Sequence, residues 1–197
     1  MRAHRPAVPH TVFSSGFTLL EVLIALLVLA LGVMGAAAMQ LSALRARQQS
    51  TLLAQATQMA FGLAERMRAN PVQTRLADGA NAYLGLDYDA LADPHPAAPE
   101  PLCLGTGGAC GSAQMALFDL YELKLLVSAN LPAGRAVVCR DAGLWSGGKL
   151  RWSCAGGAGA PLVVKIGWRG KNPDGTPHID DDGQYAPAVA LGLGATP

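Results

Sequence analysis

A single carboxylate, Glu21, stands at the start of a long apolar stretch. Residues 22–39, which follow it, contain no charged and no strongly polar side chain. A run of about 18 apolar residues is long enough to cross the hydrocarbon core of a bilayer as a helix. An ionised carboxylate in hydrocarbon is costly unless it has a partner, so Glu21 is a candidate functional residue. The alternative is an ordinary signal anchor in which the glutamate has no role.

All four cysteines lie beyond this apolar stretch, at Cys103, Cys110, Cys139 and Cys154. An even number of cysteines in an oxidising compartment predicts two disulfides, and four cysteines allow three pairings. We expect Cys103–Cys110 and Cys139–Cys154, because each pair closes a local loop, and we expect the second to join two neighbouring strands. Zinc is the alternative ligand, but neither spacing resembles the short C-x₂₋₄-C arrangement of zinc sites.

Other residues give no pattern of a catalytic, metal or cofactor site. Asp174, Asp180, Asp181 and Asp182 precede Gly183, but their spacing does not match a calcium-binding EF-hand loop, and a solvated acidic loop is favoured. The sequence holds no G-x-S-x-G element and no phosphate-binding loop, and its four histidines are scattered. We therefore expect no enzyme activity, cofactor or metal, and the formal net charge of +1 gives no reason to expect nucleic-acid binding.

The stretch Gly16-Phe17-Thr18-Leu19-Leu20-Glu21, followed by the apolar run, resembles the cleavage and assembly motif of the type IV pilin superfamily. The resemblance implies that a prepilin peptidase cuts after Gly16 and methylates the new amino group of Phe17. It also implies that Glu21 meets such an amine, either its own or that of a neighbouring subunit, and so guides assembly.

Residues 1–16 are expected to form the leader. They are polar and contain prolines, with Arg2, His4, Arg5 and His10 as basic groups, and they lack the apolar segment of a signal peptide that is removed whole. A basic leader favours a cytoplasmic location, which places the remainder in the periplasm. An internal translation start remains an alternative.

A long helix over residues 17–70 must position Glu21. We expect residues 17–40 to lie in the membrane or filament core. From there on the apolar residues recur at helical spacing and predict one buried stripe: Leu41, Leu44, Leu52, Ala56, Met59, Leu63 and Met67. Asn70-Pro71 should end the helix, because the residue before proline disfavours the helical conformation.

Residues 71–197 should form a periplasmic head, which makes the expected fold α+β: a long helix packed on a small antiparallel sheet. Residues 72–111 are predicted to be irregular. Ser112 is a candidate cap for a helix over residues 113–130. This helix is expected to bury Ala116, Leu120, Leu123 and Val127. Strands are expected at residues 135–140, 149–154 and 162–168, paired as an antiparallel meander, with a short edge strand within 186–193.

A second resemblance is carried by Leu63-Ala64-Glu65-Arg66-Met67-Arg68-Ala69-Asn70, which is similar to a stretch of the PilV family of minor pilins. The similarity continues in patches around the cysteines and residues 116–120, 131–134 and 163–168. One departure is Leu123, where the family leads us to expect tryptophan.

These features predict a minor pilin that is cleaved, N-methylated and built into a type IV pilus, supporting pilus assembly and further roles in adhesion or twitching motility. Its implied partners are the prepilin peptidase, other minor pilins, the major pilin and the inner-membrane assembly platform. It would span the inner membrane once and then reach the extracellular pilus. The alternatives are a minor pseudopilin of a type II secretion system and a membrane-anchored periplasmic enzyme.

Overall fold

The computed structural model describes residues 16–104, 109–157, 159–172, 175–180 and 183–194. The chain divides into two compact units, Met1–Ala43 and Leu44–Pro197, and the second unit is called the head below. Helix α1 spans Leu19–Ala69 and contributes to both units. The α+β class is confirmed, because the head packs this helix against a small antiparallel sheet.

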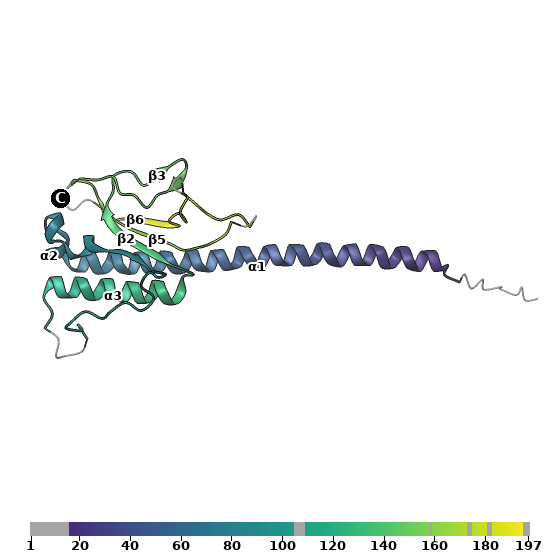
Figure 1. Ribbon diagram of the computed structural model, residues 1–197, viewed down its shortest axis with the longest axis horizontal. Helices are drawn as coiled ribbons and strands as arrows, with labels where there is room; N and C mark the ends of the chain where they lie inside the picture. Colours follow the sequence, from purple (N-terminus) through teal and green to yellow (C-terminus); the bar gives the residue numbers. More distant parts are fainter. Residues whose placement is uncertain (1–15, 105–108, 158, 173–174, 181–182, 195–197) are drawn as a thin grey trace, which may run out of the picture. The chain divides into compact units, whose positions relative to one another are not determined.

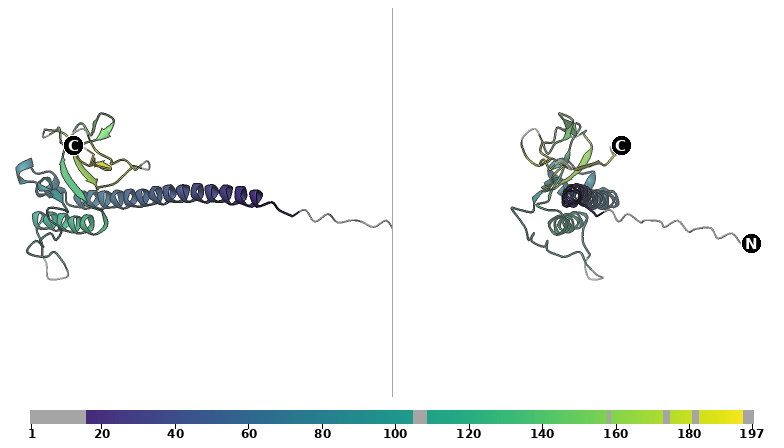
Figure 2. Two further views of the ribbon diagram at one scale, coloured as in Figure 1. Left: turned by 45° about the vertical axis from the view of Figure 1, so that its right-hand side comes forward. Right: turned by 90° about the vertical axis from the view of Figure 1, so that its right-hand side faces the viewer.

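Within the head, α1 lies between the sheet and a second long helix, α3 (Ser112–Asn130) (Figures 1 and 2). One apolar cluster joins the three layers, and its members include Met59, Leu63, Leu120, Val138 and Ile166. The predicted stripe of α1 is buried at Ala56, Met59, Leu63 and Met67, and Leu52 is partly buried. The prediction was wrong for Leu41 and Leu44, which are exposed, because the side chains that cover the stripe reach back only to Leu52.

The main sheet has the strand order β1-β2-β5-β6 and is antiparallel throughout. Its strands are β1 (Asp87–Asp89), β2 (Arg135–Arg140), β5 (Leu162–Gly167) and β6 (Val189–Gly192). The strands at residues 135–140 and 162–168 and the edge strand within 186–193 were predicted, whereas β1 was not. Two of the three residues of β1 are aspartates, which are depleted in strands, and only Tyr88 points into the core.

The predicted three-strand meander was wrong. Strand β2 pairs directly with β5, and the chain between them forms a separate hairpin of β3 (Trp145–Ser146) and β4 (Lys149–Leu150). Gly147 and Gly148 both have positive φ, as a tight two-residue hairpin turn requires. The strand expected at 149–154 therefore ends at Leu150, and residues 151–154 lie outside any strand.

Between α1 and α3 the chain is mostly irregular, as expected, with short helical turns at α2 (Pro71–Thr74), η1 (Asp78–Ala80) and η2 (Ala82–Gly85). Helix α3 buries the four predicted residues Ala116, Leu120, Leu123 and Val127. Its cap differs from the prediction. The helix begins at Ser112, and the backbone N–H of Gly111 donates to Gln114 Oε1 at 2.9 Å.

A fragment that begins at residue 44 should be soluble and folded, because the head has its own apolar cluster and both disulfides. Size-exclusion chromatography and circular dichroism of the oxidised fragment would test this. An aggregated or unfolded fragment would contradict the division into two units, and the full-length chain in detergent provides the comparison.

Candidate functional site

The segment that precedes α1 is open to its surroundings. The side chain of Phe17 is 88% exposed. A Cβ atom added to Gly16 would have no atom of the described chain within 4 Å. Packing within the described part of the chain therefore does not require glycine at position 16.

Glu21 has a partner within its own chain, in the first turn of α1. Its Oε2 accepts hydrogen bonds from the backbone N–H of Thr18 at 2.9 Å and from the Thr18 hydroxyl at 3.1 Å. The Glu21 N–H donates to Thr18 Oγ1 at 3.3 Å, and the Thr18 carbonyl accepts from the Val22 N–H. This is a capping box, in which two free backbone donors at a helix start are satisfied reciprocally.

The capping box explains why α1 begins at Leu19 and not at residue 17, since Thr18 occupies the N-cap position. Thr18 was not singled out from the sequence. The signal was present, however, because Thr-x-x-Glu has the spacing of a capping box.

The apolar run contributes no side chain to the core of the protein. Every residue from 17 to 39 is exposed. In the described part of the chain, α1 is the one helix long and apolar enough to cross a membrane. A continuous apolar surface of this size indicates contact with lipid or with other proteins.

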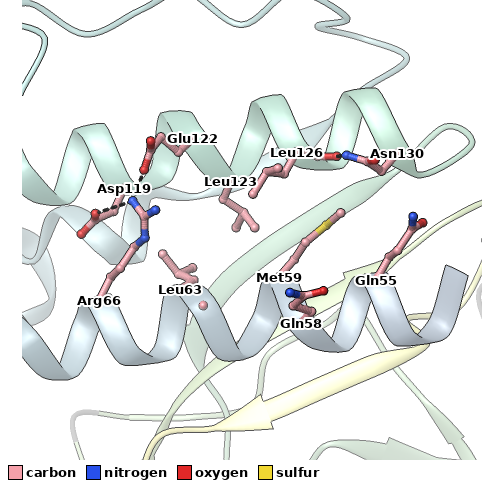
Figure 3. A pocket seen from close by; sticks show the side chains of 11 residues that line it. Gln55, Gln58, Met59, Leu63, Arg66, Asp119, Glu122, Leu123, Leu126 and Asn130 are labelled. Carbon is pink, nitrogen blue, oxygen red and sulfur yellow. Dashed lines mark hydrogen bonds and ion pairs between the residues drawn. The ribbon is translucent and has the colours of Figure 1, made fainter. Parts of the chain in front are cut away.

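In the head, residues 63–70 tie α1 to α3. Arg66 Nη1 donates to Asp119 Oδ1 at 3.1 Å and also to Glu122 (Figure 3). Arg66 and its two carboxylate partners lie at one end of a groove of about 300 Å³. The lining of this groove also includes Met59 and Leu63. Asp119 is buried, so Arg66 compensates a carboxylate that has left water.

Asn70, at the end of the same segment, extends this network. Its Nδ2 donates to the Ser112 carbonyl at 2.7 Å and to the Tyr83 hydroxyl at 3.3 Å. The Tyr83 hydroxyl donates to Asp119 Oδ2 at 2.7 Å. Burial and the Asp119 carboxylate raise the pKa of Tyr83 above its usual value, so the hydroxyl stays neutral and keeps donating. Sequence reasoning did not identify Tyr83 or Asp119, which have no spacing signal.

Both cysteine pairs are joined in the structure as the local pairing predicted, with Cα–Cα distances of 5.9 Å for Cys103–Cys110 and 6.4 Å for Cys139–Cys154. One expectation was wrong. Cys139 lies in β2, but Cys154 lies in the segment that follows the β3–β4 hairpin, so this disulfide does not join two neighbouring strands.

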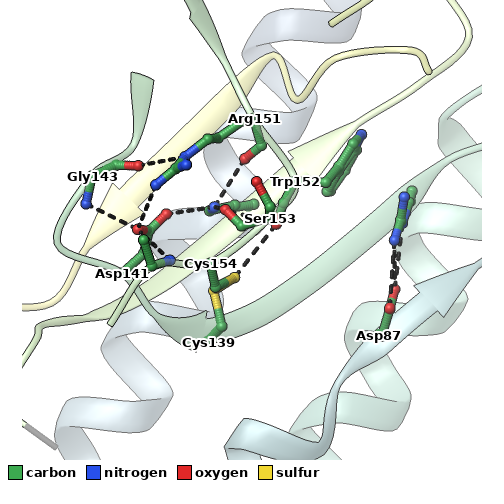
Figure 4. The surroundings of a disulfide bond; sticks show 11 residues. Asp87, Cys139, Asp141, Gly143, Arg151, Trp152, Ser153 and Cys154 are labelled. Carbon is green, nitrogen blue, oxygen red and sulfur yellow. Dashed lines mark hydrogen bonds and ion pairs between the residues drawn. A yellow bond between two sulfur atoms is a disulfide. The ribbon is translucent and has the colours of Figure 1, made fainter. Parts of the chain in front are cut away.

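A buried ion pair beside the Cys139–Cys154 disulfide holds that segment against the sheet (Figure 4). Lys165 on β5 is fully buried, and its Nζ donates to Asp141 Oδ2 at 2.6 Å. It also donates to the carbonyls of Arg151 and Ser153, both at 2.9 Å. Sequence reasoning missed this pair, because a lysine inside an apolar strand gives no indication of where its partner lies.

The second carboxylate oxygen of Asp141 also accepts hydrogen bonds. Oδ1 accepts from the backbone N–H groups of Gly143 at 2.9 Å and Ala155 at 3.0 Å. Burial alone would raise the pKa of Asp141. The hydrogen bonds from Lys165 and the two N–H groups outweigh burial and lower the pKa below its ordinary value of 3.8.

Of the acidic loop considered as a calcium site, Asp174, Asp181 and Asp182 lie outside the described residues. Asp180 is buried, and its Oδ1 accepts from the Gln184 N–H at 2.9 Å. No group of three or more His, Cys, Asp or Glu side chains able to hold a metal ion occurs among the residues that the structure describes.

Comparison with known families finds two matches, which together cover residues 13–121. Residues 13–37 match the family model described as the prokaryotic N-terminal methylation motif, and residues 38–121 match the one described as type IV pilin Tt1218. No curated protein and no solved structure matches the chain. The chain is thus similar to type IV pilins directly behind a stretch similar to the N-terminal methylation motif, and the two adjoining matches support a place in the type IV pilin superfamily.

Proposed function

We propose that the protein is a minor pilin of the PilV type, which is cleaved after Gly16, methylated on Phe17 and incorporated at low copy into a type IV pilus. The observation that carries the proposal is the placement of Gly16, Phe17 and Glu21 at the exposed start of an apolar helix, where Thr18 is the residue of the described chain that Glu21 contacts through its carboxylate. The protein acts by assembly and has no catalytic role.

Processing after Gly16 is supported by the surroundings of that residue. The bond between Gly16 and Phe17 precedes the first residue of α1, so a peptidase can reach it without unwinding a helix. Because the described chain itself places nothing near Gly16, the need for a small residue there is assigned to the peptidase.

Assignment to the minor pilins is supported by the head. Arg66 and Asn70, from the segment that resembles the PilV family, make the hydrogen bonds that tie α1 to α3 and to η2. In this proposal the partners are the prepilin peptidase, other minor pilins, the major pilin and the inner-membrane assembly platform. The protein spans the inner membrane once, with its head in the periplasm, before it enters the extracellular pilus.

The variant Gly16→Glu should keep its leader, because a large charged side chain would block the close approach of the peptidase to the backbone. Intact mass of the membrane protein from pilus-competent cells would show the uncut chain, whereas the wild type would begin at Phe17. Gly16→Ala, which adds only one carbon, is the control and should still be cut. A wild-type chain in these cells that begins at Met1 would contradict the proposal.

Detection of the protein in pili sheared from cells distinguishes a component of a type IV pilus from a component of a type II secretion system. A minor pilin of a type IV pilus should co-sediment with the sheared pili. Retention with the cells and co-purification with secretion components would instead show a pseudopilin.

A further inference from the structure

The head contains a groove of about 500 Å³ between α1 and hairpin β3–β4. Ala46 and Leu53 of α1 form one wall, and hairpin β3–β4 forms another. Trp145 and Trp168 add two indoles to the lining, and Lys149 and Lys171 add two positive charges. A concave, mostly apolar site with a few charges has the character of a binding site.

Trp145 is the most conspicuous residue of this groove, because its side chain is 65% exposed while Trp152 and Trp168 are buried. It pairs with Leu150 across a hairpin closed by the tight turn at Gly147 and Gly148. The indole is therefore presented on a short, ordered element. Exposed tryptophans in such positions are enriched among the residues that carry most of the binding energy of protein interfaces.

The two lysines that line the groove, Lys149 and Lys171, are both basic, and the lining includes no carboxylate. Residues 142–172 contain no acidic residue, and their basic residues are Lys149, Arg151, Lys165, Arg169 and Lys171. Arg151 and Lys165 face the buried carboxylate of Asp141, whereas Lys149 and Lys171 are exposed. The groove thus suits a partner that combines an apolar side chain with carboxylates.

This chain carries such a feature in the turn after β1. Leu91 is 54% exposed and stands between the exposed aspartates Asp89 and Asp93. The turn is ordered, because the Leu91 N–H donates to Asp89 Oδ1 at 2.8 Å and the Asp93 N–H donates to the Asp89 carbonyl at 2.9 Å. Residues 76–104 contain no lysine or arginine.

The Leu91 turn does not line the groove, although Asp89 and the groove residue Trp168 both line a neighbouring pocket. The turn is tied to the α3 layer, since the Ser128 hydroxyl donates to the Pro94 carbonyl at 3.2 Å and the Lys124 ammonium lies 5.9 Å from the Tyr88 ring. Figures 1 and 2 show hairpin β3–β4 on the sheet side of α1 and α3 on the other side. One copy can therefore offer its turn to one neighbour while its groove receives the turn of another, which is a heterologous contact.

We propose that the groove of one copy receives the Leu91 turn of a second copy. Leu91 enters between the two indoles, and the carboxylates of Asp89 and Asp93 face Lys149 and Lys171. Both surfaces are ordered in the single chain, which lowers the entropic cost of association. Copies anchored in one membrane by the same helix share an orientation, which raises their effective concentration. The contact requires neither cleavage after Gly16 nor entry into a pilus.

The test is photo-cross-linking of the full-length chain in its own membrane, with Leu91→benzoylphenylalanine as the probe. Light should yield a covalent dimer whose adduct maps to the β3–β4 hairpin or to residues 168–172. Trp145→Ala and Lys149→Glu, introduced separately, should each lower the dimer yield by about tenfold or more, as loss of an interface hot spot does. The same probe at Leu125, another exposed leucine on the α3 side, should give no adduct in the groove.

Charge reversal makes the test independent of damage to the fold. A copy with Lys149→Glu and no probe should receive the turn of a probe-carrying, differently tagged Asp93→Lys copy better than it receives the turn of a probe-carrying copy that is otherwise wild type. Arg75→Glu, an exposed charge change outside both surfaces, should leave the dimer unchanged. The proposal is overturned by a missing dimer, by adducts only to lipid or to another protein, by adducts outside the groove, or by a dimer insensitive to these charges.

Discussion

Glu21→Ala should give a chain that inserts and is cleaved normally but enters the filament at least about tenfold less often. Neither insertion nor cleavage needs the carboxylate, whereas pairing with the amine of Phe17 in a neighbouring subunit does. In hydrocarbon, loss of one member of a charge pair leaves the other member unpaired and is strongly unfavourable. The measurement is the amount of protein in sheared pili, together with co-purification of other pilins.

The capping box offers a second role for Glu21, and two further variants separate the roles. Glu21→Gln keeps an oxygen that can accept from Thr18, since glutamine also serves in a capping box, but it removes the charge. Thr18→Ala removes the cap and keeps the charge. If the charge guides assembly, Glu21→Gln should fail like Glu21→Ala, and Thr18→Ala should be much milder. Normal incorporation of Glu21→Gln would show that the carboxylate acts as a helix cap and not as the assembly contact.

Lys165→Met should lower the free energy of unfolding of the head by about 3–5 kcal/mol, because it leaves the Asp141 carboxylate buried without its partner. It also removes the donor that satisfies the carbonyls of Arg151 and Ser153. Urea unfolding of the fragment that begins at residue 44, followed by tryptophan fluorescence, would measure the change.

Lys149→Met is the matched control for this measurement, since Lys149 is an exposed lysine in β4. It should change the stability by no more than about 0.5 kcal/mol. A double variant, Lys165→Met with Asp141→Asn, should lose less than the sum of the two single variants, because the two groups interact directly. If the two single losses in the free energy of unfolding add up in the double variant, the direct interaction between Lys165 and Asp141 does not contribute to stability.

The same pair should make the head sensitive to acid. The pKa of Asp141 in the folded head lies below its ordinary value of 3.8, so folding favours the ionised carboxylate. Its contribution to stability is therefore complete above about pH 4–5, and it is lost as the pH falls below 3.8 toward the folded pKa. Asp141→Asn should remove this part of the pH dependence in urea unfolding experiments between pH 2 and 6.

The regular helices of this protein were predictable because their signals are local. A continuous apolar run and a repeat of apolar residues at helical spacing specify α1, and Asn70-Pro71 marks its end. The buried face of α3 follows from the same spacing. Residues 135–140 also form a strand as predicted, since their β-branched side chains and flanking turns lie within the segment itself.

The arrangement of the sheet was not predictable in the same way. Whether β2 pairs with the next segment or with β5 depends on contacts between residues distant in sequence. Lys165 lies 24 positions from Asp141, and their ion pair holds residues 151–155 against the central strands β2 and β5 as an irregular segment and not as a strand. The disulfide of Cys139 with Cys154 joins the same segment to β2.

By itself, the sequence determined the positions of Gly16, Phe17 and Glu21 and the apolar helix behind them, because cleavage motifs and hydropathy are properties of consecutive residues. Only the tertiary structure decided which buried polar groups meet: Arg66 with Asp119, Asn70 with Tyr83, and Lys165 with Asp141. Each of these groups needs a partner when it leaves water, but no local pattern names that partner, because folding brings it from another part of the chain.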